Sequence, residues 1–212
     1  MVDRELFSSV IPRAAKSIDS FDNQGLANMA WAYAVANVDA PTLFNDDFIK
    51  KCFEKKDDFN IKQLCQLHQW HLWQAREKSH DGLPQELIDR CYTAFISQDP
   101  RVSKLREDVV TQLSSIGLEP REEDLLDSGY RVDATVVVDG RTIGVEVDGP
   151  YHFIGRSTSL KGSTILKRRQ VPSIDGIVLV SVPYWEWDKF GTNQVKKQEY
   201  LRKLLRITTW KC

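Results

Sequence analysis

Apolar side chains in the first hundred residues recur at helical spacing. After Phe21 the chain places apolar or small residues at Leu26, Met29, Ala30, Tyr33 and Ala34. Steps of three and four residues predict an amphipathic helix. A second stripe predicts a partner helix, and its members are Phe44, Phe48, Ile49 and Cys52.

The same order of side chains returns 38 to 39 residues later. The matching positions are Phe21 and Phe59, Trp31 and Trp70, Phe48 and Leu87, Ile49 and Ile88, and Cys52 and Cys91. A helix-turn-helix unit of this length is typical of an α-solenoid, which usually needs three or more units. We therefore predict about two helical repeats in residues 1–98, either leaning on the following domain or forming the end of a longer array.

The pattern of residues 99–212 predicts a second domain of helices and strands, so the fold class is α+β. Ser103–Ser115 has the spacing of an amphipathic helix. Tyr130–Val138 and Arg141–Asp148 are typical of strands, and Asp139-Gly140 between them predicts a type I′ turn. Three further elements are expected. The first is a helix at Thr164–Val171, capped by Ser163 and stopped by Pro172. The others are a strand at Gly176–Val182, buried on both faces, and a helix from Asn193.

The tight turn fixes the register of the predicted hairpin. If Val138 opposes Arg141, then Val136, Ala134 and Val132 share one apolar face, and Asp133 lies across from Glu146 on the other. Asp148 follows on that second face. Three explanations for the three acids stay open: a hard cation such as Mg²⁺, a raised pKa with a shared proton, or a solvated face on which Arg131 neutralises Asp148.

The segment after the hairpin adds further chemistry. Gly149-Pro150 ends the second strand and turns His152 back toward the carboxylates. The loop Ile154–Gly162 leads to a helix that carries Lys167, Arg168 and Arg169, and the last helix adds Lys196, Lys197, Arg202, Lys203 and Arg206.

Charge is distributed unevenly along the chain. The 212 residues have a net charge of −1, yet residues 99–155 carry 6 basic and 12 acidic side chains, whereas residues 156–212 carry 12 basic and 4 acidic ones. A basic segment beside candidate metal ligands suits a phosphate-rich partner, although the two blocks can also neutralise each other.

Composition excludes several classes of protein. An apolar fraction of 42% argues against global disorder, and no apolar run approaches the roughly 20 residues that span a bilayer. The first residues match neither a secretory signal nor a transit peptide. The four cysteines lack a CxxC spacing, which argues against a zinc ribbon or redox dithiol and favours a reducing compartment.

Several motifs together resemble the RAP domain, named as an RNA-binding domain abundant in apicomplexans and also found in organelle proteins of plants, algae and animals. The motifs are Gly144-Val145-Glu146-Val147-Asp148-Gly149-Pro150-Tyr151-His152-Phe153, Lys167-Arg168-Arg169 and Val182-Pro183-Tyr184-Trp185-Glu186-Trp187. The resemblance covers about residues 103–206. The segment Leu26–Ala34 is similar to the helical repeats that precede this domain in its relatives.

The resemblance implies a restriction-endonuclease-like α/β domain with a central mixed sheet. In that superfamily an Asp, a second acid and a Lys bind a divalent metal and activate water. Carried over, the acids are Asp133 and Glu146, and Asp148 stands where the Lys is usual, so this chain departs from the pattern. Lys167 is a candidate replacement. The implied catalytic set is therefore Asp133, Glu146, Asp148, Lys167 and His152, with Mg²⁺ on the three acids.

Three functions follow as hypotheses. The first is an RNA-binding protein of organelle RNA metabolism, in the mitochondrion or chloroplast. The second is a metal-dependent endoribonuclease, and the third is a structural component of a ribonucleoprotein. The expected partner is single-stranded or ribosomal RNA, and we expect no membrane partner. The candidate RNA-binding residues are Arg156, Lys161, Lys167, Arg168, Arg169, Lys196, Lys197, Arg202 and Lys203.

Overall fold

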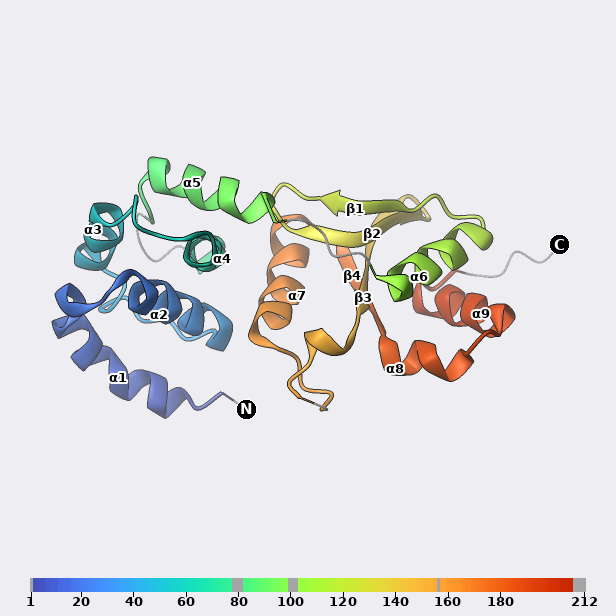
Figure 1. Ribbon diagram of the computed structural model, residues 1–212, viewed down its shortest axis with the longest axis horizontal. Coiled ribbons are helices and arrows are strands. Elements are labelled where there is room, and N and C mark those ends of the chain that lie inside the picture. The colour runs from blue at the N-terminus through green and yellow to red at the C-terminus, as the bar shows by residue number, and fades with distance from the viewer. Residues whose placement is uncertain (1, 78–81, 99–102, 156, 208–212) are drawn as a thin grey trace. The chain divides into compact units, whose positions relative to one another are not determined.

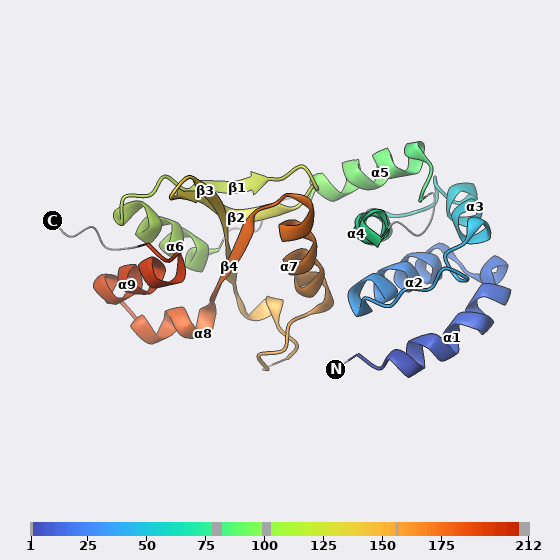
Figure 2. The same ribbon diagram turned by 180° about the vertical axis from the view of Figure 1, so that it is seen from behind.

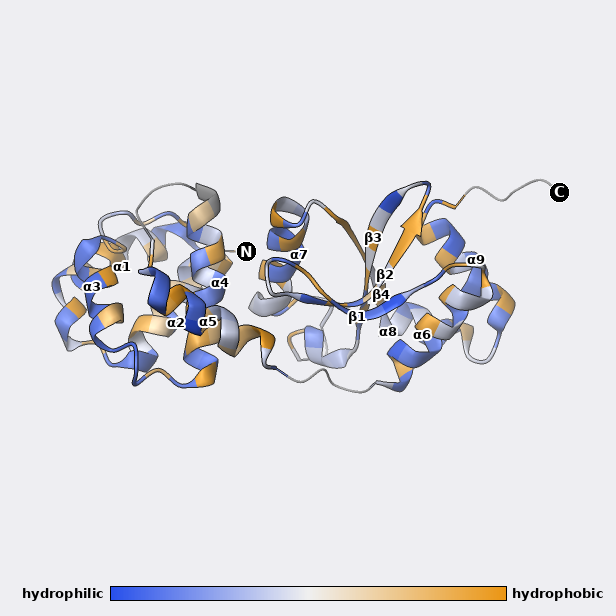
Figure 3. Cartoon of the chain, turned by 90° about the horizontal axis from the view of Figure 1, so that it is seen from above, coloured by the Kyte–Doolittle hydropathy of each residue, from blue (hydrophilic) through white to orange (hydrophobic). Residues whose placement is uncertain are grey.

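A computed structural model describes residues 2–77, 82–98, 103–155 and 157–207 (Figure 1). It has a mixed α+β fold, with helices followed by a four-stranded sheet. The chain divides into two compact units, residues 1–98 and residues 99–212. Along the helices of both units, hydrophobic and hydrophilic residues succeed each other in bands (Figure 3). This banding is the pattern expected where one side of each helix is buried.

The first unit is helical. Its elements are α1 (Arg4–Lys16), the 3₁₀ turn η1 (Ile18–Ser20), α2 (Asn23–Ala36), α3 (Asp46–Glu54), α4 (Ile61–Glu77) and α5 (Gln85–Ile96). Polar caps define two of the starts. The Asp22 carboxylate accepts the Gly25 N–H at 2.7 Å, and the Asn45 side chain accepts the Phe48 N–H at 3.2 Å. Such caps satisfy N–H groups that have no partner within the helix.

Helices α2 and α4 pack together through aromatic and amide side chains. Trp70 and Trp73 are buried, and the Phe44 and Phe48 rings each lie 5.3 Å from the Trp70 ring. Hydrogen bonds join Trp31 to Gln69 at 2.7 Å and Gln66 to Asn28 at 3.0 Å. Both bonds connect residues 38 apart, which is the spacing of the sequence pattern.

Helix α1 matches the second helix of the sequence pattern, a relationship that the sequence analysis missed. Ala14 of α1, Cys52 of α3 and Cys91 of α5 stand 38 and 39 residues apart and are all buried. Tyr33 of α2 fixes α1, because its hydroxyl donates to the Phe7 carbonyl at 2.8 Å and its ring lies edge-on to the Phe7 ring. Small side chains recur here because only they fit between closely packed helices.

The second unit is a sheet covered by helices on both faces. Its elements are α6 (Lys104–Ser115), β1 (Arg121–Leu125), β2 (Arg131–Val138), β3 (Arg141–Asp148), η2 (Pro150–His152), α7 (Gly162–Ile174), β4 (Val178–Pro183), α8 (Tyr184–Trp187), η3 (Asp188–Phe190) and α9 (Gln194–Leu204). The strand order is β1-β2-β3-β4, with β3 and β4 parallel and the other pairs antiparallel. Helix α7 lies on one face, and α6, α8 and α9 lie on the other (Figure 1, Figure 2).

The apolar core of this unit lies between the sheet and the pair α6 and α9. Val109 and Leu113 of α6 and Leu201 of α9 pack against apolar side chains of the strands. The strand residues in this core are Ala134, Val136, Val145, Val147 and Val182. Side chains alternate between the two faces of a strand, so residues such as Glu146 and Asp148 on β3 face α7 instead.

The predicted hairpin register is confirmed over most of its length. The pairs run from Val138–Arg141 through Val136–Ile143 to Ala134–Val145. The helix predicted to start after Asn193 is also confirmed, since the Asn193 side chain caps α9 by accepting the Lys196 N–H at 3.1 Å.

Three predictions about this unit are wrong. Pro172 does not stop α7, which continues to Ile174, and the cap is Lys161 rather than Ser163. The Ser173 hydroxyl lies 2.9 Å from the Gln170 carbonyl and supports this last turn. The strand predicted to be buried on both faces is β4, which lies at an edge of the described sheet with Val178 57% exposed. An apolar run by itself does not distinguish an edge strand from a central one.

Candidate functional site

Two carboxylates of β3 face α7 and form the centre of the candidate site. Glu146 and Asp148 lie two residues apart on the same face of the strand and are 4% and 0% exposed. Consecutive residues of α7 neutralise them. The Lys167 ammonium lies 2.6 Å from the Glu146 Oε1 atom, and Arg168 donates to the Asp148 carboxylate. A buried acid is tolerated only when such a partner is present.

Asp148 has three partners from three different elements. Besides Arg168 of α7, the Ser181 hydroxyl of β4 donates to it, and the His152 Nδ1 atom of η2 lies 3.0 Å from its Oδ1 atom. Burial alone would raise the pKa of Asp148. Hydrogen bonds from His152 and Ser181, with the charge of Arg168, outweigh burial and hold this pKa below its ordinary value. Asp148 is therefore an ionised anchor for the loop, the helix and the edge strand.

For Glu146 the effects that raise the pKa outweigh those that lower it. Burial raises the pKa of its carboxyl to about 7, against the lowering effect of Lys167, and the neighbouring Asp133 adds to the rise. Two acids on one strand thus differ in protonation behaviour because one has several hydrogen-bond donors and the other has mainly an ammonium. A carboxyl that titrates near neutral pH beside a lysine is able to exchange a proton with a bound group.

Asp133 joins the cluster from an irregular part of β2. Its Oδ2 atom accepts the Val147 N–H at 2.7 Å. The alternation of faces shifts by one residue here: Tyr130 donates through its hydroxyl to Gln170 of α7 at 2.7 Å, and Val132 contacts Gly144, whereas Ala134 faces the α6–α9 core. Strand β2 is therefore irregular at Asp133, although its pairing with β1 keeps one register on both sides of this residue.

The irregular backbone at Asp133 corrects one detail of the predicted register. Val132 lies on the α7 side, so it does not share the face of Ala134, and regular pairing of Asp133 with Glu146 is not part of the register. The opposing strand is irregular at the same level. Glu123 of β1 has a φ of +50° between the pairs Glu122–Ala134 and Asp124–Val132. No local sequence signal marks this irregularity, because it depends on the packing of both neighbouring strands.

The five residues predicted as catalytic lie in one cluster. Lys167 contacts Glu146 and His152 contacts Asp148, and Asp133 and Asp148 are close enough to Glu146 to influence its pKa. Sequence reasoning missed Ser181. Its only signal is that it is the polar member of the otherwise apolar segment Ile177–Val182.

The predicted RNA-binding cations separate into engaged and exposed groups. Lys167 and Arg168 are bound to carboxylates. Lys197 is 7% exposed, lies 2.7 Å from the Asp108 carboxylate and stacks over the Trp187 ring, so its predicted contact with RNA would require it to leave this pair. Arg169 is half-buried on α7 and Arg202 half-buried on α9, and the exposed members are Lys161, Lys196 and Lys203. Arg156 lies outside the described residues.

The donors of the cluster do not fit a bound Mg²⁺ as they are arranged here. Within the described ranges, no three His, Cys, Asp or Glu side chains gather into a group able to hold a metal ion. Glu146 and Asp148 direct their oxygens at Lys167 and Arg168 instead of a shared point. Mg²⁺ on Asp133, Glu146 and Asp148 therefore stays a prediction, one that requires the two cations to move away.

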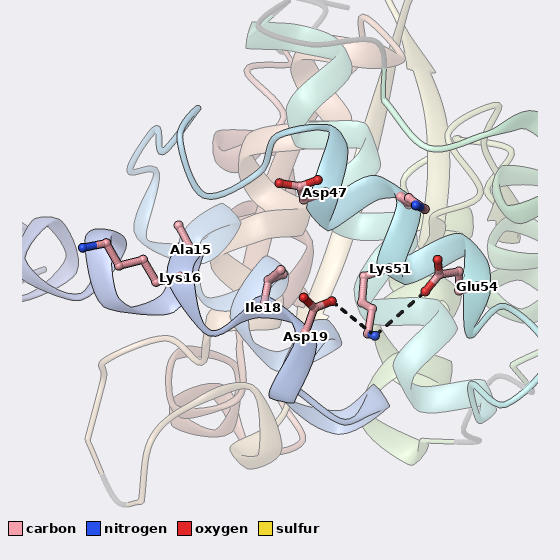
Figure 4. A pocket seen from close by; sticks show the side chains of 8 residues that line it. Ala15, Lys16, Ile18, Asp19, Asp47, Lys51 and Glu54 are labelled. Atoms are coloured by element: carbon pink, nitrogen blue, oxygen red, sulfur yellow. Dashed lines mark ion pairs between the residues drawn. The ribbon is translucent and has the colours of Figure 1, made fainter.

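The helical unit contains a separate polar pocket of about 350 Å³ between the α1–η1 segment and α3 (Figure 4). Lysines and acids alternate around it, and Lys51 bridges Asp19 at 3.4 Å and Glu54 at 3.9 Å. None of the predicted site residues lines this pocket.

In the described part of the chain, helices fall short of the length and apolarity that crossing a bilayer requires.

Comparison with known proteins finds a match to a described family over most of the cluster. Residues 145–204 match the family model of the RAP domain, a span that includes both β3 acids and both α7 cations. The chain is also 26% identical over 203 residues to the RAP domain-containing protein, chloroplastic, of rice (Oryza sativa subsp. japonica). The aligned region covers 88% of this chain and 30% of that relative, so the chain spans about a third of the relative's length. The predicted resemblance to the RAP domain is confirmed for residues 145–204 of the second unit.

Proposed function

We propose that this chain binds single-stranded RNA and acts in organelle RNA metabolism. The observation that carries the proposal is the RAP domain match over residues 145–204. The rice relative is called chloroplastic, which favours the plastid as the compartment. Processing, stability, splicing and ribosomal RNA maturation are the candidate steps. Because the relative is much longer than this chain, its whole activity enters here only as part of the proposal.

The exposed cations indicate where the phosphates would bind. Lys196 and Lys203 are exposed on α9, and Arg202 is half-exposed between them. This helix buries Leu201 in the core on the face of the sheet opposite to α7. Cations that are not neutralised by buried acids are the ones that can displace the counterions of a phosphate backbone. We infer that α9 is the main phosphate contact, with Lys161 beside α7 as a second, separate contact.

The first test is whether the chain holds RNA. Ultraviolet crosslinking in the native organelle, followed by sequencing of the recovered RNA, identifies the target. The purified chain should then bind that RNA with an affinity that falls steeply as salt rises. A flat salt response, or no crosslinked RNA, would count against RNA as the partner.

Matched single-charge variants test the surface. Lys203→Gln should lower the slope of log affinity against log salt by about 0.7, the value for one phosphate contact on a single strand. Arg141→Gln is the control, since Arg141 is exposed at the Asp139-Gly140 turn, at the opposite end of β3 from the cluster. Equal slopes for both variants would remove α9 from the interface while leaving RNA binding itself intact.

One observation favours a second function, metal-dependent cleavage of RNA. All five residues predicted as catalytic gather around Glu146 and Asp148. The donors do not fit Mg²⁺ in this arrangement, so we derive no cleavage step from it. The test is incubation of the bound RNA with Mg²⁺. Cleavage by the unmodified chain that is lost in Asp133→Asn, with binding retained, would select the endoribonuclease, whereas no cleavage in either protein would leave RNA binding or a structural role.

A further inference from the structure

The loop between β3 and α7, residues 149–161, has a rigid base beside the carboxylate cluster. His152 bonds Asp148 at its start, and the Lys161 N–H at its end donates to the His152 carbonyl at 2.9 Å. The Ile154 N–H donates to the Ser159 carbonyl at 2.8 Å, and Phe153 forms a β-bridge with Leu160. Inward, the Phe153 ring is 4% exposed and lies 4.5 Å from the Trp185 ring. The residues at the base of this loop therefore have fixed positions.

Tyr151 projects from this fixed base. It lies in η2, directly before His152, and is 79% exposed. This is the highest exposure among the large hydrophobic side chains that the structure describes. The anchored neighbours on either side, Asp148 and Phe153, hold the backbone that carries the ring. An aromatic ring kept in water on a fixed turn is placed to meet a flat apolar surface at little cost in conformational entropy.

The other aromatic side chains near the cluster are used for packing. Trp187 is 2% exposed and donates through its indole N–H to Asp108 at 2.8 Å. Trp185 and Tyr184 are half-buried, with ring centroids 5.2 Å apart, and Trp185 covers Phe153. Among the aromatic side chains described beside the cluster, Tyr151 is therefore the exposed one.

We propose that Tyr151 stacks on an unpaired base of the bound RNA, next to the Glu146–Asp148 cluster. The inference rests on the proposed RNA-binding function and gives it a stacking site. Every nucleobase has a π-face, so such a contact serves a single strand of any sequence. The neighbouring charges suit the same ligand, because the exposed Lys161 is joined through its backbone to His152 and is available to a phosphate. An apolar protein segment would leave this cation without a partner.

The test uses the full chain, with short oligouridine and oligoadenosine as probes. Tyr151→Ala should weaken binding about 5- to 150-fold, the range expected for one lost base stack, at an unchanged salt slope because no phosphate contact is removed. Tyr151→Phe keeps the ring and should bind within about twofold of the unmodified chain. Ile154→Ala is the matched control, since Ile154 is 58% exposed on the same loop and has no ring.

The outcomes separate the two proposals. If the unmodified chain binds neither probe nor its crosslinked RNA, the proposed function fails and the stacking site fails with it. If the unmodified chain binds with a steep salt dependence while Tyr151→Ala binds equally well, the function stands and the stacking site is overturned. A probe carrying 2-aminopurine gives an independent readout, because stacking quenches its fluorescence, and this quenching should be absent in Tyr151→Ala and retained in Tyr151→Phe. Urea unfolding of each variant shows that the fold is unchanged.

Discussion

The Lys167 ammonium lies 2.6 Å from the Glu146 carboxylate, and the next residue of α7, Arg168, donates to Asp148, two residues further along β3. Neighbouring cations on a helix thus match alternate acids on a strand. The match works because both acids point to the same face of β3 and α7 crosses that face. In this arrangement the two cations occupy the carboxylates that a metal ion would need. Variants of Lys167 and Glu146 therefore test what the site does.

Removal of the ammonium should destabilise the second unit. Lys167→Met leaves a buried carboxylate without its cation, and we expect a loss of about 3 kcal/mol in the free energy of unfolding at pH 8. The loss should be smaller at pH 6, because the raised pKa of Glu146 lets this carboxyl become neutral. Urea unfolding at both pH values measures the difference. Lys203→Met, an exposed control on α9, should stay within about 0.5 kcal/mol, and equal losses in the two variants would contradict the buried pair.

Stability should depend on pH through Glu146. Its pKa rises from 4.5 to about 7 on folding, so the folded state holds the proton more tightly than the unfolded state. The stability contributed by this group is therefore fully present below pH 4.5 and is lost as pH rises through about 7.

Comparison with Glu146→Gln isolates this effect. The free energy of unfolding of the unmodified chain, relative to that of the variant, should fall between pH 5 and pH 8 with a slope approaching about 1.4 kcal/mol per pH unit. Asp148 has a lowered pKa, so its own stabilisation is lost only at more acid pH. Parallel pH curves for the two proteins would show that Glu146 titrates normally.

A second ion pair, between Asp108 and the buried Lys197, should hold α6, α8 and α9 together. Asp108 of α6 accepts from the Lys197 ammonium of α9 at 2.7 Å and from the Trp187 indole of α8 at 2.8 Å. In Asp108→Ala both donors lose their acceptor, and we expect a loss of about 2–3 kcal/mol, below the full value for a buried pair because the carboxylate is partly exposed. Urea unfolding measures it, with the exposed Glu119→Ala as control. A loss no larger than that of the control would mean that water replaces the carboxylate.

Two glycines of the β3 region should respond differently to the same substitution. A Cβ at Gly144 would lie 2.6 Å from the Leu179 Cδ2 atom of β4 and 3.1 Å from the Val132 Cγ1 atom, so Gly144→Ala should cost about 1–3 kcal/mol through overpacking. A Cβ at Gly149 meets no atom within 4 Å, and Gly149→Ala should change stability by about 0.5 kcal/mol or less. Thermal unfolding of both variants measures the contrast. Gly144 is therefore explained by its close contact with the neighbouring strands. Similar stabilities of the two variants would contradict this explanation.

The local features of the fold follow from short segments of sequence. The Asp139-Gly140 turn sets the pairs from Val138–Arg141 to Ala134–Val145, because a two-residue turn allows only one register for the two strands. Asn193 starts α9 through its own side chain. Both features depend on atoms a few residues apart, so no other part of the chain can change them.

Features that depend on residues far apart in the chain could not be predicted from the sequence. The irregular backbone at Asp133 lies between β1 on one side and β3 on the other, and the edge position of β4 depends on which strands pair with it. The same holds for the basic residues. Lys203 and Lys197 lie on the same helix, yet one is exposed and the other is buried against Asp108, 89 residues away.

The sequence by itself determined the RAP motifs, the hairpin and the set of acids, because residue type and near-neighbour spacing carry that information. Only the tertiary structure decided that Lys167 and Arg168 pair with those acids, that Lys197 is buried against Asp108, and that the Tyr151 ring is exposed. The burial of a side chain and the identity of its partners depend on how separate helices and strands pack together. The pattern of residues within one segment does not contain this information.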